Sequence, residues 1–111
     1  MDKDYDVWNI DEILKAYSNV PDMAKNVKTA LESLFIFLEK NSLITSTISD
    51  ENGNIIKVFI KKSELTSEGL LIGCGPKNPI HRWLGSKSSQ KTPPDMKLLE
   101  KALLEIRKSN H

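Results

Sequence analysis

Cys74 and His81 are the two residues whose types most directly suggest catalysis. A thiol close to an imidazole can act as a nucleophile with its own general base. However, no Asp or Asn stands in a recognised arrangement to orient the imidazole, and a lone cysteine usually packs as a small hydrophobic residue. No Cys-x-x-Cys or His-x-x-x-His spacing occurs that would indicate zinc. We therefore expect no catalytic residue, no bound metal and no enzyme activity.

A glycine-rich stretch, LLIGCGPK at residues 70–77, is the second candidate for chemistry. It resembles the first motif of S-adenosylmethionine-dependent methyltransferases, in which a glycine turn lets the backbone approach the cofactor. Lys77 stands where the third glycine would be, and only 34 residues follow it, too few for the β-α units of that fold. The sequence therefore predicts that Gly73 and Gly75 end a helix and turn the chain, and that no cofactor is bound.

The acidic amino-terminal segment is the third candidate, as a surface for binding a basic protein. Residues 1–12 contain five acids and a single base, Lys3, and two further acids lie in the connection at residues 50–53. Tyr5 and Trp8 alternate with these acids, and such aromatic residues either anchor interfaces or dock onto the domain's own core. A merely solvated segment is the alternative to a binding patch. The candidate partner-binding residues are Asp4, Tyr5, Asp6, Trp8, Asp11, Glu12, Asp50 and Glu51.

The elements that must position these residues follow from the apolar periodicity. Residues 9–18 predict a short helix capped by Asn9, and residues 23–40 predict a central helix with Asp22 as its cap and Met23 in its buried stripe. Residues 67–72 and 79–84 predict two further helices, the latter with Asn78 as cap and Pro79 in its first position. A last helix, to about residue 108, is expected to begin at Thr92 with the two prolines in its first turn.

Residues 43–49 and 54–61 predict a β-hairpin, because both are rich in β-branched and aromatic residues. A three-residue loop with Gly53 in the left-handed conformation sets the register so that Ile48 lies opposite Ile56. That register places five residues on one buried face: Ile44, Ile48, Ile56, Val58 and Ile60. The sequence thus predicts an α+β fold of order α-α-β-β-α-α, with a two-stranded antiparallel hairpin packed on a helical core.

Length, composition and charge limit the remaining possibilities. The 111 residues predict a single domain over 1–111, with an acidic segment at 1–8 and a tail at 109–111 that we set aside as a candidate tag remnant. The net charge is only +1, from a net −3 in residues 1–42, +3 in residues 43–91 and +1 thereafter. One cysteine, no signal peptide and no long apolar run predict a cytoplasmic protein that does not span a membrane. The oligomeric state stays open.

A winged-helix-like regulator that binds nucleic acid is the alternative function. In this interpretation Lys57, Lys61 and Lys62 would form the tip of the wing. However, the bases comprise 14 lysines and two arginines, whereas base reading favours arginine, and the isoelectric point is about 7.8. We therefore expect no direct contact with nucleic acid.

Three stretches of the carboxy-terminal half carry a family resemblance: SELTSEGL at 63–70, WL at 83–84 and LLEKAL at 98–103. Over about residues 63–107 the chain resembles the small bacterial immunity proteins encoded beside the toxins of contact-dependent growth inhibition systems. The resemblance implies a cytoplasmic protein that binds one cognate toxin domain and blocks its active site. Such toxins are commonly nucleases. A nuclease tends to be basic because its substrate is anionic, so acidic patches would speed association with it.

Overall fold

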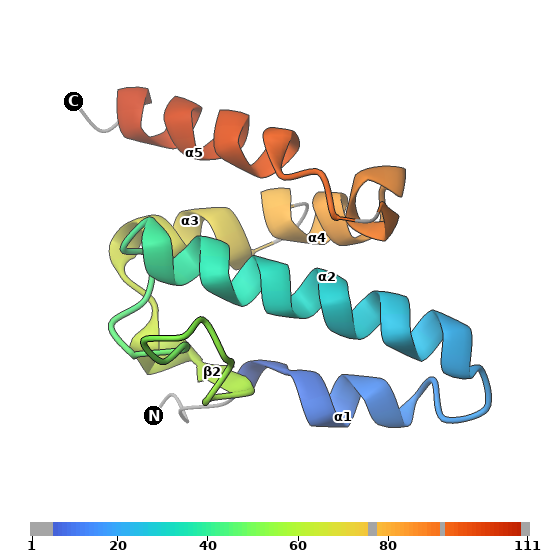
Figure 1. Ribbon diagram of the computed structural model, residues 1–111. Coiled ribbons are helices and arrows are strands. Elements are labelled where there is room, and N and C mark those ends of the chain that lie inside the picture. Colours follow the sequence, from blue (N-terminus) through green and yellow to red (C-terminus); the bar gives the residue numbers. More distant parts are fainter. Residues whose placement is uncertain (1–5, 76–77, 92, 110–111) are drawn as a thin grey trace.

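The computed structural model describes residues 6–75, 78–91 and 93–109 of the chain (Figure 1). Within these residues, five α-helices and one two-stranded antiparallel sheet confirm the predicted α+β class. The elements in chain order are β1 (Asp6–Asn9), α1 (Ile10–Lys15), α2 (Pro21–Lys40), β2 (Phe59–Lys61), the 3₁₀ turn η1 (Lys62–Glu64), α3 (Ser67–Gly73), α4 (Pro79–Leu84), the 3₁₀ turn η2 (Lys87–Gln90) and α5 (Lys97–Ser109).

Helix α2 lies at the centre, between a layer formed by α1 and the sheet and a layer formed by α3, α4 and α5 (Figure 1). Its carboxy-terminal half is covered from both sides, which explains why apolar residues surround it there. The buried residues of α2 are Ala30, Leu31, Leu34, Phe35, Phe37 and Leu38. The first turns of α2 leave this core, so the prediction that Met23 is buried is wrong, and 53% of its surface is exposed.

The predicted caps are confirmed at α1 and α4. The Asn9 side chain accepts a hydrogen bond from the Glu12 N–H at 3.2 Å, and the Asn78 side chain accepts one from the His81 N–H at 2.8 Å. The predicted cap of α2 is wrong by two residues. That helix begins at Pro21, where a proline fits because the first position needs no N–H, and Val20 in the cap position has no side-chain acceptor to form a cap.

The start of the last helix also differs from the prediction. Thr92, the expected cap, lies outside the described residues, and α5 begins only at Lys97. The prolines therefore precede the helix instead of forming its first turn. Asp95 takes over part of the capping, since its carboxylate accepts a hydrogen bond from the Lys97 N–H at 3.0 Å. Its carbonyl oxygen accepts one from the buried Trp83 Nε1 at 2.7 Å.

The tip of the predicted hairpin is confirmed, whereas its continuous ladder is not. Gly53 has a φ of 84°, and Ser49 pairs with Ile55, as the three-residue loop requires. Ile56 donates its N–H to the Ile48 carbonyl at 2.8 Å. Ile48, however, donates its own N–H to the Glu39 carboxylate at 2.6 Å and not across the hairpin. One of the two hydrogen bonds that would join Ile48 and Ile56 in an antiparallel ladder is therefore missing, and the two segments separate beyond this pair.

The regular sheet instead joins the amino terminus to the end of the predicted second strand. β1 pairs antiparallel with β2, with Trp8 opposite Ile60. Ile44, predicted to face Ile60, forms an isolated bridge with Leu65. The predicted buried face is therefore only partly formed. Ile44, Ile48 and Ile60 are buried, but Ile56 is 60% exposed although its N–H bonds to the Ile48 carbonyl.

Helix α3 approaches its neighbours through two glycines. A Cβ on Gly69 would lie 2.2 Å from the Leu43 carbonyl oxygen, and one on Gly73 would lie 2.5 Å from Cη2 of Trp8. The predicted role of Gly75 in a turn is confirmed by its φ of 92°. Gly73 ends α3 as expected, and it also makes room for an indole ring, which the sequence analysis did not anticipate.

Candidate protein-binding surface

The structure separates the predicted partner-binding residues into different environments. Asp4 and Tyr5 lie outside the described residues. Trp8 was predicted either to contact a partner or to dock onto the domain's own core, and the structure favours the core. Its pairing with Ile60 directs the indole inward to the space beside Gly73, and only 7% of the residue is exposed. Trp8 is therefore corrected from a contact residue to a core residue.

The described acids of the amino-terminal segment, Asp6, Asp11 and Glu12, are exposed, but two of them already have cationic partners. Asp6 forms an ion pair with Lys61 at 3.4 Å and accepts a hydrogen bond from Asn9. Glu12 forms an ion pair with Lys15 at 3.0 Å. Asp11 is exposed and has no ion pair with any described residue. The acidic surface that the sequence predicts is thus present at α1, but much of its charge is balanced locally.

The two acids of the hairpin tip differ in role. Asp50 accepts hydrogen bonds at 2.9 Å from the N–H groups of Asn54 and Asn52, and these bonds lower the pKa of its carboxyl group. The first function of Asp50 is therefore to shape the loop. Glu51, next to it, is exposed and is directed to no described partner. It is the tip residue whose carboxylate stays available for another molecule.

A groove of about 520 Å³ lies between α1, the first turns of α2 and η2. Side chains from three separate segments form its apolar wall, since Ile13 and Tyr17 come from α1 and the turn after it, Met23 and Val27 from α2, and Leu84 from the end of α4. Polar groups at its edge are Asp22, Asn26, Ser89 and Gln90. A wall of this composition, with few polar groups, is typical of binding sites.

The sequence does not predict this groove, although it assigns other roles to two of the residues that line it, Asp22 and Met23. The sequence predicts an apolar stripe along the helix at residues 23–40 and places Met23 in it as a buried residue. The amino-terminal part of α2 extends past the covering elements, which leaves its apolar stripe open to solvent. Met23 is 53% exposed and Val20, in the turn before α2, is 46% exposed. The absence of a covering element could not be inferred from periodicity alone.

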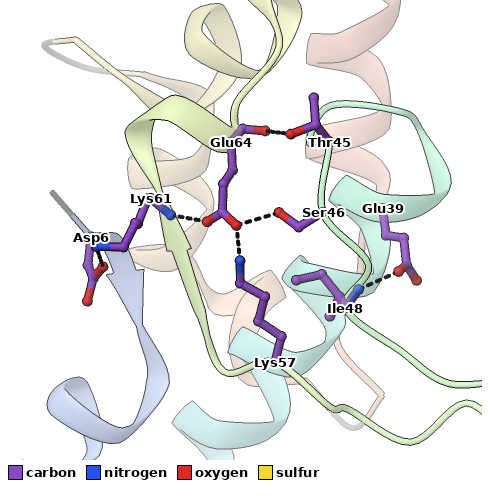
Figure 2. A network of polar contacts seen from close by, with 8 residues as sticks. All are labelled: Asp6, Glu39, Thr45, Ser46, Ile48, Lys57, Lys61 and Glu64. Carbon is purple, nitrogen blue, oxygen red and sulfur yellow. Dashed lines mark hydrogen bonds and ion pairs between the residues drawn. The ribbon is translucent and has the colours of Figure 1, made fainter. Parts of the chain in front are cut away.

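A network of carboxylates fixes the irregular segment between α2 and β2 (Figure 2). The Glu64 carboxylate lies at its centre and accepts hydrogen bonds from the Ser46 hydroxyl at 2.7 Å and the Lys61 N–H at 2.6 Å. It also forms an ion pair with Lys57. Glu39 accepts bonds from the Ser49 hydroxyl at 2.6 Å and from two backbone N–H groups. The network therefore serves the scaffold rather than a ligand.

Two of the three lysines of the alternative winged-helix interpretation belong to this network. Lys57 is paired with Glu64 and lies 4.7 Å from the centroid of the Phe59 ring, and Lys61 is paired with Asp6. Ion pairing of this kind reduces the positive potential that a phosphate backbone would meet. The segment also lacks the regular hairpin of a wing. The structure thus offers no observation that favours the nucleic-acid alternative.

Glu39 gives the scaffold a predictable dependence on pH. Hydrogen bonds from the Ser49 hydroxyl and the Ile48 N–H lower its pKa below 4.5. A carboxylate whose pKa is lowered by folding stabilises the fold above the unfolded pKa, and this contribution is lost as the pH falls through the folded pKa. We expect the difference in unfolding free energy between wild type and Glu39→Gln, measured by urea unfolding, to shrink as the pH is lowered from 7 to 3.

The control for this measurement is Glu51→Gln, which removes an exposed carboxylate that accepts no hydrogen bond within the described residues. It should follow the wild type across the same pH range. A constant difference between wild type and Glu39→Gln at every pH would show that the ionised carboxylate does not hold the segment.

The thiol of Cys74 lies partly buried beside the core, and burial raises its pKa above 9.0. A raised pKa keeps the thiol protonated at neutral pH, where only the thiolate is nucleophilic. We expect iodoacetamide to alkylate Cys74 in the folded chain more slowly than it alkylates free cysteine at pH 7.5. Faster alkylation than free cysteine would indicate an activated nucleophile and would reopen the catalytic interpretation of Cys74.

No group of three His, Cys, Asp or Glu residues that could hold a metal ion occurs in the described part of the chain. Among the described helices, none combines the length and apolar character needed to cross a bilayer. Comparison with protein-family models, with curated proteins and with solved structures finds no match for this chain.

Proposed function

We propose that this chain is an immunity-type inhibitor, which binds a cognate toxin domain and blocks the active site of that toxin. The observation that carries the proposal is an open apolar groove with the exposed carboxylate of Asp22 at its edge. Apolar side chains line the groove from α1, α2 and α4, and the acids Asp11, Glu12 and Asp22 lie on the two helices that border it. Protein interfaces commonly combine an apolar centre with a polar or charged rim.

The resemblance to immunity proteins, which lies in the carboxy-terminal half of the chain, supports the same function. Its three stretches fall in η1 and α3, in α4 and in α5. These helices contact one another and form the layer that covers α2 (Figure 1). The resembling residues would therefore build the scaffold, while the groove and the acids of α1 and α2 would provide the surface that recognises the toxin.

The chemistry of a nuclease toxin fits such a surface. A nuclease needs a positive active-site cleft, because its substrate is a polyanion. An inhibitor that covers the cleft gains fast and specific association from carboxylates on its own surface. Asp11, Asp22 and Glu51 are exposed acids that have no described internal partner, and they are available for this role. The proposed partner is thus a basic nuclease domain.

Co-expression tests this proposal directly. The probe is the proposed cognate toxin domain, sought as the carboxy-terminal domain of a large secreted protein encoded beside this chain, and produced in a laboratory bacterium with and without the chain. We expect the domain alone to stop growth, and co-expression of the chain to restore growth and yield a stoichiometric complex. Unchanged toxicity together with the absence of a complex would contradict the proposal. A tagged copy carrying Leu34→Asp, which disrupts the core, controls for effects of expression alone.

A further inference from the structure

We propose that the groove between α1 and α2 receives an aliphatic or aromatic side chain from a basic segment of the partner, and that a lysine or arginine beside it pairs with Asp22. This inference rests on the proposed function, and it names the chemistry that the partner must present. Four arguments lead to it. The wall of the groove is exposed, Asp22 is the only charge among its described lining residues, and the lysines of α2 point away from it. The fourth argument is that a second copy of the chain would bring no cation to Asp22.

The wall of the groove is apolar and unusually accessible. Met23, at its centre, is 53% exposed, and Tyr17 and Val27 are half-buried. The volume of about 520 Å³ is larger than any one side chain and falls in the range of small-molecule and peptide-anchor sites. An apolar side chain bound in it would remove part of this exposed surface from water, which is the main source of affinity at interface centres.

Asp22 supplies the charge of the groove. Among the described residues that line the groove, Asp22 is the only charged one. It forms no ion pair or hydrogen bond with another described residue. A carboxylate at the edge of an apolar wall favours a ligand that brings a cation next to its apolar group, and it disfavours an anionic one.

The lysines of α2 do not supply that cation. Successive residues of a helix are rotated by about 100°, so Lys25 and Lys28 point about 150° away from the middle of the groove side of α2. Both are exposed, and neither lines the groove. The cation that complements Asp22 therefore has to come from the partner.

A second copy of the chain is the less favourable occupant. In a twofold dimer the same surface meets itself, so the interface would hold two Asp22 carboxylates and no cation from the groove lining. Two carboxylates facing each other across an apolar contact repel. A basic partner meets no such penalty.

The test is to pan a phage-displayed library of random short peptides against the full-length chain. We expect the enriched peptides to contain a large apolar residue with a lysine or arginine within one helical turn. Binding of these peptides should weaken at least about tenfold in Met23→Gln, which removes the apolar centre of the groove. It should weaken about fivefold at low salt in Asp22→Asn, the effect of one partly exposed ion pair.

Two control variants match these substitutions. Leu71→Gln changes a residue with the same 53% exposure on α3, away from the groove, and Glu105→Gln removes an exposed carboxylate from α5. Both should bind the peptides as the wild type does. Because all four substituted side chains are exposed, thermal melts should show that each variant folds.

Several outcomes would overturn the inference. These are a lack of enrichment, enrichment of acidic peptides, equal binding by Met23→Gln, or a concentration-dependent dimer that Met23→Gln abolishes. The inference and the proposed function can fail separately. If Met23→Gln restored growth in the co-expression experiment as well as the wild type does, the groove would not be the binding site, yet the immunity function would stand.

Discussion

Replacing Gly69 by alanine is expected to lower the free energy of unfolding by about 3 kcal/mol, the upper end of the usual cost of overpacking. The new Cβ would lie 2.2 Å from the Leu43 carbonyl oxygen and 3.2 Å from Cδ2 of Leu65. The carbonyl cannot easily move aside, because it accepts hydrogen bonds from both the N–H and the hydroxyl of Thr66. Relief of the clash therefore requires α3 to separate from the segment that follows α2.

The measurement is equilibrium unfolding of Gly69→Ala in urea, followed by circular dichroism. Gly85→Ala is the matched control, because the nearest atom to its Cβ would be 3.7 Å away, an ordinary contact. That substitution should be neutral or stabilise the chain by up to about 1 kcal/mol, since it reduces the entropy of the unfolded state. If Gly69→Ala and Gly85→Ala unfolded at the same urea concentration, α3 would not pack on Leu43 as described.

Removal of the Glu64 carboxylate is expected to have the second largest effect. Glu64→Ala should lower the free energy of unfolding by about 2–3 kcal/mol, because it leaves a cation and two hydrogen-bond donors without their acceptor. The Lys57 and Glu64 side chains are only 21% and 18% exposed, so water replaces the lost contacts poorly. The Lys61 N–H and the Ser46 hydroxyl lose their partner at the same time (Figure 2).

Glu64→Gln separates the two parts of this effect. The amide can still accept hydrogen bonds but has no charge. We therefore expect the free energy of unfolding of Glu64→Gln to lie between those of the wild type and Glu64→Ala. Glu68→Ala is the control, because its ion pair with Arg107 at 3.2 Å is more exposed and should contribute no more than about 1 kcal/mol. A Glu64→Ala variant as stable as Glu68→Ala would mean that the network does not hold the segment between α2 and β2.

Local signals in the sequence were sufficient to predict the helices. Asn9 and Asn78 cap the helices that follow them, and Gly53 forms the expected loop, because each depends on residues only a few positions apart. The pairing of the strands depends on distant residues. Trp8 lies opposite Ile60, and Glu39 takes the N–H of Ile48, so the amino terminus and α2 compete with the hairpin. Sequence periodicity contains no information on that competition.

For the candidate binding surface too, local signals could be predicted and contacts between distant residues could not. The exposed acids of α1 and of the hairpin tip could be identified from charge, and Asp11 and Glu51 are found at the surface. The burial of Trp8 and the internal ion pair of Asp6 depend on β2, which is more than 50 residues away in the chain. The groove unites α1 and α2 with residues near the end of α4 and in η2. Only the fold shows that these segments meet and leave Met23 uncovered.

The most direct test of the central claim is to titrate the purified chain against the proposed cognate toxin domain while measuring the nucleolytic activity of that domain. If the chain blocks the active site, activity should fall in proportion to added chain and vanish at a one-to-one molar ratio. Met23→Gln should require an excess of chain, and Leu71→Gln should inhibit as the wild type does. Full activity in a large excess of the folded wild-type chain would contradict the claim.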